Sequence, residues 1–91
     1  MGKEKVFSQA SFATKLRVPE GTPYVLAENA DEVRSAIESG RAAMVESCNG
    51  RAFVWKQDGK YHVDQFFFGP RRELDYDSED AAVDYASSMC E

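Results

Sequence analysis

Two turn-forming dipeptides, Asn49-Gly50 and Asp58-Gly59, constrain the fold of this chain more than any other feature. Both central residues of a type I′ turn need a positive φ, which asparagine, aspartate and glycine adopt readily. The two dipeptides separate three segments that are rich in strand-forming residues: AAMVESC, RAFVWKQ and KYHVDQFFF. Two tight turns in succession predict a three-stranded antiparallel meander.

A fourth strand and two helices complete the predicted architecture. A Gly-Pro turn at 69–70 leads into RRELDY, so the meander extends over residues 42–76. Apolar residues at helical spacing predict one helix before the meander, at 30–39, and a C-terminal helix after it, at 78–90. The expected fold is therefore a single α+β domain, residues 1–91, with an antiparallel sheet of three to five strands.

Capping residues mark the ends of both predicted helices. Asn29 is a preferred N-cap, and Glu32 stands at the capping-box position three residues later. Gly40 ends the first helix. Asp77 or Ser78 caps the second helix. The apolar stripe of that helix consists of Ala82, Tyr85, Ala86 and Met89.

The N-terminal segment follows no single period. SQASFATKLRV fits a short helix, but Phe12, Thr14, Leu16 and Val18 also alternate as they would in a strand. PYVLA, which follows, fits a short strand.

Tight turns fix the register of neighbouring strands, so the side chains divide between two faces of the sheet. The expected partners are Val45 with Val54, Val54 with Val63, Trp55 with His62, and Phe67 with Leu74. One face is almost wholly apolar and receives the helices: Ala43, Val45, Ala52, Val54, Tyr61, Val63, Phe67, Leu74 and Tyr76. The other face mixes aromatic and charged groups: Met44, Glu46, Cys48, Arg51, Phe53, Trp55, His62, Asp64, Phe66, Phe68, Glu73 and Asp75.

The second face has two interpretations. Either the N-terminal segment folds over it and makes a second core layer, or it is exposed to a partner or to a second copy of the chain. Large exposed apolar patches on monomers mark interaction sites. On the second interpretation the contact residues are Phe53, Trp55, His62, Phe66 and Phe68.

Charge is divided unevenly along the chain. Residues 1–72 hold all 11 basic residues against nine acids, whereas residues 73–91 hold seven acids and no base. Acidic side chains near a helix N-terminus are stabilised by the helix dipole. This preference does not explain why the last 19 residues lack lysine and arginine. We expect an acidic edge that imitates a row of phosphates: Glu73, Asp75, Asp77, Asp80 and Asp84.

Enzyme chemistry finds no support in the residues. His62 is the only histidine, and the predicted register puts the Cys48 thiol roughly 13 Å from its imidazole, too far for a nucleophile and its base. No cysteine and histidine spacing is typical of a metal site, and no glycine-rich loop is typical of a phosphate or cofactor site. We therefore expect no catalytic residue, no metal and no cofactor.

The cysteines and the hydropathy bear on location. Cys48 and Cys90 do not make a disulfide framework, so both thiols are expected free in a reducing cytoplasm. No apolar run approaches the roughly 20 residues of a membrane-spanning helix, and the N-terminus lacks the apolar core of a secretory signal.

These features predict a small cytoplasmic, non-enzymatic inhibitor that blocks a basic, nucleic-acid-handling protein through its acidic edge and its aromatic sheet face. In size, charge and style the chain resembles acidic α+β inhibitors encoded by phages and mobile elements, including anti-CRISPR proteins and DNA mimics. This likeness includes no family motif, and it assigns no residues.

Two other functions remain open. A homodimeric structural or regulatory module would associate through Phe53, Trp55, Phe66 and Phe68. A single-strand nucleic-acid binder would stack bases on the same aromatic side chains. Binding of nucleic acid also needs a basic track, and the acids on this face outnumber its bases, so direct binding is disfavoured.

Overall fold

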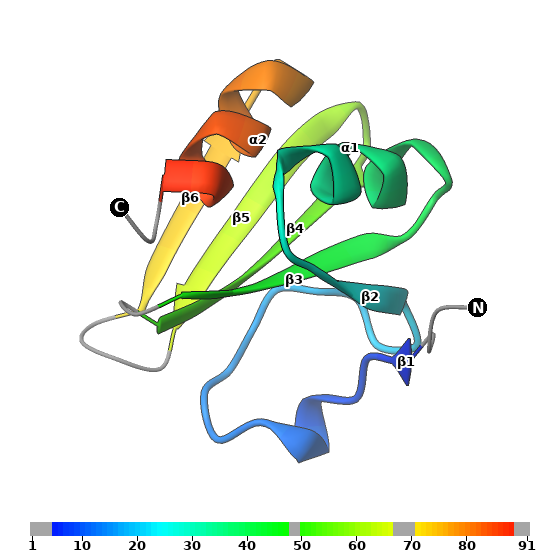
Figure 1. Ribbon diagram of the computed structural model, residues 1–91. Helices are drawn as coiled ribbons and strands as arrows, with labels where there is room; N and C mark the ends of the chain where they lie inside the picture. The colour runs from blue at the N-terminus through cyan, green and yellow to red at the C-terminus, as the bar shows by residue number, and fades with distance from the viewer. Residues whose placement is uncertain (1–4, 48–49, 67–70, 89–91) are drawn as a thin grey trace.

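The computed structural model describes residues 5–47, 50–66 and 71–88 and shows a six-stranded sheet with two helices (Figure 1). The strands are β1 Lys5–Val6, β2 Pro23–Ala27, β3 Ala42–Ser47, β4 Gly50–Gln57, β5 Lys60–Phe66 and β6 Arg72–Tyr76. The helices are α1 Ala30–Glu38 and α2 Glu79–Ser87, and a 3₁₀ turn spans Gln9–Ser11. The α+β class is thus confirmed.

The sheet is larger than expected and is mixed. The strands lie in the order β1 to β6, and β2 runs parallel to β3, whereas every other neighbouring pair is antiparallel. A strictly antiparallel sheet of three to five strands is therefore wrong. Parallel neighbours need a crossover connection, which α1 provides between β2 and β3.

The turn between β4 and β5 forms as the sequence indicates. Asp58 and Gly59 have φ values of 56° and 80°, as a type I′ turn requires. Val54 pairs with Val63, and Trp55 pairs with His62, as expected.

The other two expected registers are wrong by an even number of residues. Gly50 pairs with Ser47 and so begins β4 instead of completing a turn, which brings Ala52, not Val54, opposite Val45. Across β5 and β6, Val63 pairs with Leu74. A shift by an even number of residues keeps each side chain on its face, so both predicted faces survive. Cys48 and Asn49, and the segment 67–70 with its Gly-Pro turn and with Phe67 and Phe68, lie outside the described residues.

Both helices begin at the predicted caps. The side-chain oxygen of Asn29 accepts a hydrogen bond from the Glu32 amide at 2.9 Å. Glu32 reaches back to the amide of Glu28 at 2.7 Å, one residue before the position expected in a capping box. Ser78 caps α2 by accepting from the Ala81 amide at 3.1 Å. The described part of α2 ends at Ser87, and residues 89–91 lie outside the described residues.

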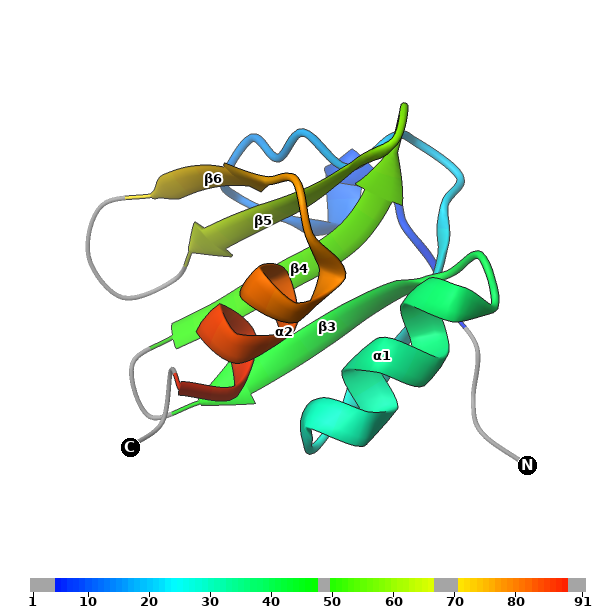
Figure 2. The same ribbon diagram turned by 90° about the horizontal axis from the view of Figure 1, so that it is seen from above.

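The two helices cover one face of the sheet and make the first core (Figures 1 and 2). Val33 and Ile37 of α1 and Ala82 and Ala86 of α2 are buried there, as their spacing predicts. Val83 is buried as well, although the predicted stripe omits it. From the sheet this core takes Ala43, Ala52, Val54 and Val63, with Val45, Tyr61, Leu74 and Tyr76 packed at its margin.

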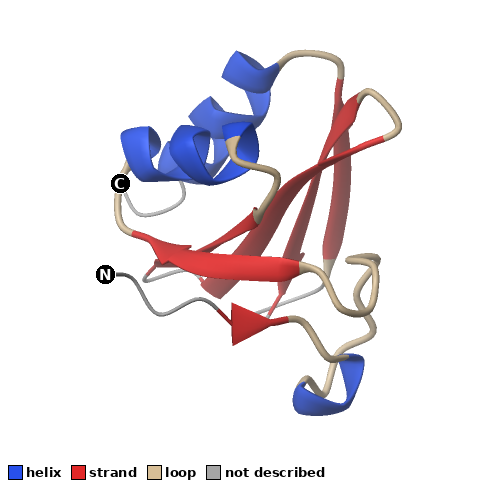
Figure 3. Cartoon of the chain, turned by 90° about the vertical axis from the view of Figure 1, so that its right-hand side faces the viewer, coloured by secondary structure: helices blue, strands red, loops and turns tan. Residues whose placement is uncertain are grey.

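An N-terminal arm, residues 7–22, covers the other face and makes the second core (Figure 3). It is neither a regular helix nor a strand: a 3₁₀ turn leads into irregular chain that Gln9 holds in place. The side chain of Gln9 donates to the Thr14 carbonyl at 2.8 Å and accepts from the Leu16 amide at 2.9 Å. Of the two interpretations of this face, the structure therefore has the second core layer.

The aromatic side chains of this face are consequently not exposed. Phe53, Trp55 and Phe66 are 0%, 3% and 5% exposed, so the expected aromatic docking face is absent among the described residues. The physical reason is that the arm buries its own apolar side chains by packing on them. The ring of Phe53 lies within 5.5 Å of the rings of Phe7 and Phe12 and 5.1 Å from that of Tyr24.

Candidate functional site

The acids of both helices share one outer surface, which we call the acidic helix face. Residues 28–39 and 77–88 contain eight acids and one base, a net charge of −7, whereas the chain as a whole carries −5. Because α1 and α2 lie side by side on the same side of the sheet, these charges belong to one layer (Figure 2). The acids are Glu28, Asp31, Glu32, Glu38, Asp77, Glu79, Asp80 and Asp84. All are exposed except Glu79, which is half-buried.

Arg34, the single base of residues 28–39 and 77–88, joins the two helices. Its guanidinium lies 2.7 Å from the carboxylates of both Glu79 and Asp80 at the start of α2. Hydrogen bonds to Asp80 and then Glu79 raise the pKa of Arg34. Arg34 is therefore occupied within the layer, and the carboxylates around it remain in excess.

Three of the predicted acidic residues lie on this face. Asp77 and Asp80 are strongly exposed, with side chains 89% and 79% accessible. Asp77 lies 3.4 Å from the ammonium of Lys60, a contact between two exposed groups that solvent screens. Asp84 is exposed and makes no ion pair with another described residue.

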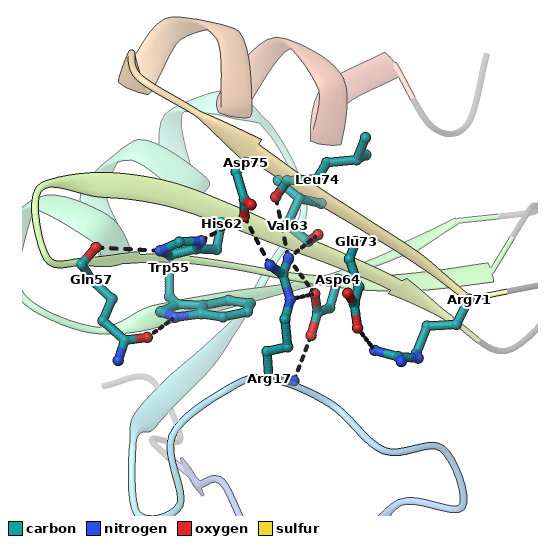
Figure 4. Close-up of polar contacts among 10 residues, drawn as sticks. All are labelled: Arg17, Trp55, Gln57, His62, Val63, Asp64, Arg71, Glu73, Leu74 and Asp75. Atoms are coloured by element: carbon teal, nitrogen blue, oxygen red, sulfur yellow. Dashed lines mark hydrogen bonds and ion pairs between the residues drawn. The ribbon is translucent and has the colours of Figure 1, made fainter.

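The other two predicted acids lie on the opposite side of the sheet. Strand alternation places Glu73 and Asp75 on the face of the sheet opposite the helices, as the predicted faces have them, so they do not join the acidic helix face. Glu73 pairs with Arg71, and Asp75 contacts the arm (Figure 4). Sequence reasoning did not include the acids of α1 in the acidic surface. A signal was present, because Asp31, Glu32 and Glu38 fall outside the apolar stripe of this helix and should therefore face solvent.

A buried ion pair fastens the arm to the sheet. Asp64 is fully buried, and its carboxylate accepts from the backbone amide of Arg17 at 2.6 Å and from the Arg17 side chain at 2.7 Å. The same guanidinium contacts Asp75 at 2.9 Å and donates to the carbonyl oxygens of Val63 and Leu74 (Figure 4). Burial lowers the pKa of Arg17, but the contacts with both carboxylates raise it by more.

Sequence reasoning did not find Arg17, but a signal was present. A carboxylate at position 64, between aromatic residues on a covered face, cannot be buried without a cation or several hydrogen bonds. Arg17 stands 47 positions away, and no local pattern connects the two residues.

His62 contacts neighbouring side chains and backbone of the sheet through both ring nitrogens and the ring face. Its Nδ1 lies 2.7 Å from Asp75 and its Nε2 3.3 Å from the Gln57 carbonyl, while its ring packs on Trp55 at 5.4 Å. Asp64, two residues further along the same strand, bonds to Arg17. Hydrogen bonds from His62 and then Arg17 lower the pKa of Asp75. Cys48, the weighed nucleophile, lies outside the described residues.

Within residues 5–47, 50–66 and 71–88, no group of three or more histidine, cysteine, aspartate or glutamate side chains is placed to hold a metal ion. In the same residues no helix has the length and apolar character needed to cross a membrane. No protein-family model, curated protein or solved structure matches the chain.

Proposed function

We propose that the protein is a small non-enzymatic inhibitor whose acidic helix face occupies the basic, nucleic-acid-binding surface of a partner protein. The observation that supports this most is the net charge of −7 on the helical layer of a chain whose remainder is +2. A surface built to neutralise phosphates is complementary to such a layer and attracts it over a distance of about 10 Å.

The packing of the helices supports the same proposal. Both helices pack on the first core, so the backbone positions that carry the carboxylates are fixed before binding. A backbone fixed in advance reduces the conformational entropy that binding removes. Charge complementarity of this kind speeds association and excludes like-charged competitors more than it adds affinity.

The proposal differs from the sequence-based hypothesis in the part assigned to the aromatic residues. Phe53, Trp55 and Phe66 lie under the arm, so we assign the contact to the acidic helix face alone. The same burial removes support from a dimer or a single-strand binder that uses these rings. We place the protein in the cytoplasm and among the acidic inhibitors, anti-CRISPR and DNA-mimic proteins included, that act by occupying a groove made for nucleic acid.

Competition with nucleic acid tests this function. The tagged protein is used to capture partners from lysate, and the captured protein is purified and bound to its own DNA or RNA. We expect this protein to displace the nucleic acid in a mobility-shift titration and to lose that ability in the Asp77→Lys/Asp80→Lys variant. A partner that stays fully bound to nucleic acid at saturating inhibitor contradicts the proposal.

A further inference from the structure

A pocket of about 290 Å³ opens between the two helices at one end of the acidic helix face. Figure 2 shows that the beginning of α1 and the end of α2 lie at this same end of the sheet. The pocket is below or at the lower limit of the roughly 300–1,000 Å³ usual for small-molecule sites, so it fits one long side chain better than a cofactor. Its apolar lining consists of Ala27, Ala30, Val33, Val45 and Ala86.

An acidic residue borders the pocket just before α1. Glu28 and Glu46 both line the pocket, from the neighbouring ends of β2 and β3. Strand alternation sends the Glu46 side chain to the other face of the sheet, where it contacts Arg51 at 2.9 Å, so Glu28 supplies the carboxylate on the helix side. The carboxylate of Glu28 forms no hydrogen bond or ion pair with another described residue, so it is available to a cation.

The helix ends strengthen the negative character of this rim. The last turn of α2, which reaches the pocket at Ala86 and Ser87, contains no basic residue to offset the partial negative charge of its carbonyl groups. At the N-terminus of α1, Asn29 accepts from the Glu32 amide, and the acids Asp31 and Glu32 in the first turn offset the partial positive charge of the helix end. An anion is therefore disfavoured here, and a cation is favoured.

We infer that this pocket anchors a lysine or arginine side chain of the partner protein. An aliphatic stem would lie on the alanine and valine lining while the charged head meets Glu28 at the rim, as such side chains do when they bury their methylene groups. The inference rests on the proposed function, because it names the kind of residue that the acidic helix face recognises. It adds a requirement for stem length, which charge alone does not impose.

Two synthetic peptides of equal charge separate the pocket from the surrounding field. Hexalysine and a hexamer of 2,4-diaminobutyrate carry the same positive charge at mildly acidic pH, where all their side-chain amines are protonated. Each lysine side chain is longer by two methylenes. Two buried methylenes correspond to an affinity difference of about tenfold. By calorimetry, we expect hexalysine to bind about five to ten times tighter than the shorter peptide. By NMR, the backbone amide chemical shifts that change on binding should centre on Ala27, Val45 and Ser87.

A pocket-filling variant supplies the matched control. Ala30→Leu places a larger side chain in the pocket and should abolish the difference between the peptides, whereas Ser35→Leu adds the same bulk at an exposed position of α1 outside the lining. Glu28→Gln should weaken both peptides, and hexalysine the more. Equal affinity of the two peptides for the wild type, or a difference that persists in folded Ala30→Leu, overturns the inference.

A separate variant tests the proposed function independently of the pocket. Asp84→Lys changes the charge of the acidic helix face without touching the pocket lining, and it should weaken both peptides by the same factor. Equal peptide affinities together with this loss leave the acidic face intact as a binding surface and exclude the pocket. A stem-length preference in the wild type, together with affinities for both peptides that Asp84→Lys leaves unchanged, keeps the pocket and argues against the broader acidic face.

Discussion

At the scale of single residues, the ion pair between Arg17 and Asp64 is the polar contact that fastens the arm to the sheet. Asp64 is wholly buried, whereas the Arg17 side chain remains 30% exposed, so the pair lies at the boundary between core and solvent. A buried carboxylate without its cation carries an uncompensated desolvation cost. The two backbone carbonyls that Arg17 also satisfies add to its effect.

Replacing Arg17 by methionine should lower the free energy of unfolding by about 2–3 kcal/mol, less than for a wholly buried pair because of the exposure of Arg17. Urea denaturation measures the change. The double variant Arg17→Met/Asp64→Leu should regain most of the loss, since apolar groups replace both charges. A single variant within 0.5 kcal/mol of wild type, on the scale of about ±0.5 for surface changes, contradicts this assignment.

Asp75 should make stability depend on acid pH. Its pKa is lowered in the folded state by His62 and then Arg17, so it stabilises the fold at pH values above its unfolded pKa of about 3.9. That contribution is lost as the pH falls through the lowered pKa. We expect Asp75→Asn to flatten the acid limb of a plot of unfolding free energy against pH. An acid limb as steep in Asp75→Asn as in wild type contradicts this role.

At the scale of elements, the arm is a structural layer and not a tail. Phe7 is 1% exposed in the second core, and its amide donates to the Thr22 carbonyl at 2.8 Å, so both ends of the arm are joined. Its neighbour Val6 is 63% exposed. The two adjacent residues thus have opposite environments.

Phe7→Ala should cost about 3–5 kcal/mol of unfolding free energy, as large-to-small changes in a core do. Val6→Ala, one residue earlier, should cost no more than about 0.5 kcal/mol. Both values come from urea denaturation followed by tryptophan fluorescence, since Trp55 lies in the second core. Equal costs for the two variants would show that the arm does not pack as described.

The elements also show what local sequence can and cannot predict. Asp58 and Gly59 specify their turn by their own backbone preferences, so the β4 and β5 register follows from the sequence. The parallel pairing of β2 with β3 depends on how α1 packs on the sheet. The hydrophobic periodicity of the local sequence does not reveal this packing. The arm shows no helical or strand periodicity, because side-chain hydrogen bonds of Gln9 and of the distant Asp64 hold it. These bonds take the place of the regular backbone hydrogen bonds of a helix or sheet.

At the scale of the whole molecule, charge is separated by layer and not by position in the chain. The predicted acidic edge combined the acids of α2 with Glu73 and Asp75, although the predicted register already put these two on the other face of the sheet. The fold adds the acids of α1, because helix packing brings both helices to one side of the sheet. The sequence thus predicted an acidic surface around α2 but not its extension over α1.

The most direct test compares two equal charge changes on opposite sides of the sheet. Asp84→Lys and Glu73→Lys alter the net charge alike, and each variant is titrated against the captured partner by calorimetry. We expect Asp84→Lys to weaken binding at least about tenfold, the effect of about 1.4 kcal/mol, and Glu73→Lys to bind as the wild type does. Equal weakening by both variants, or by neither, contradicts a contact made by the acidic helix face.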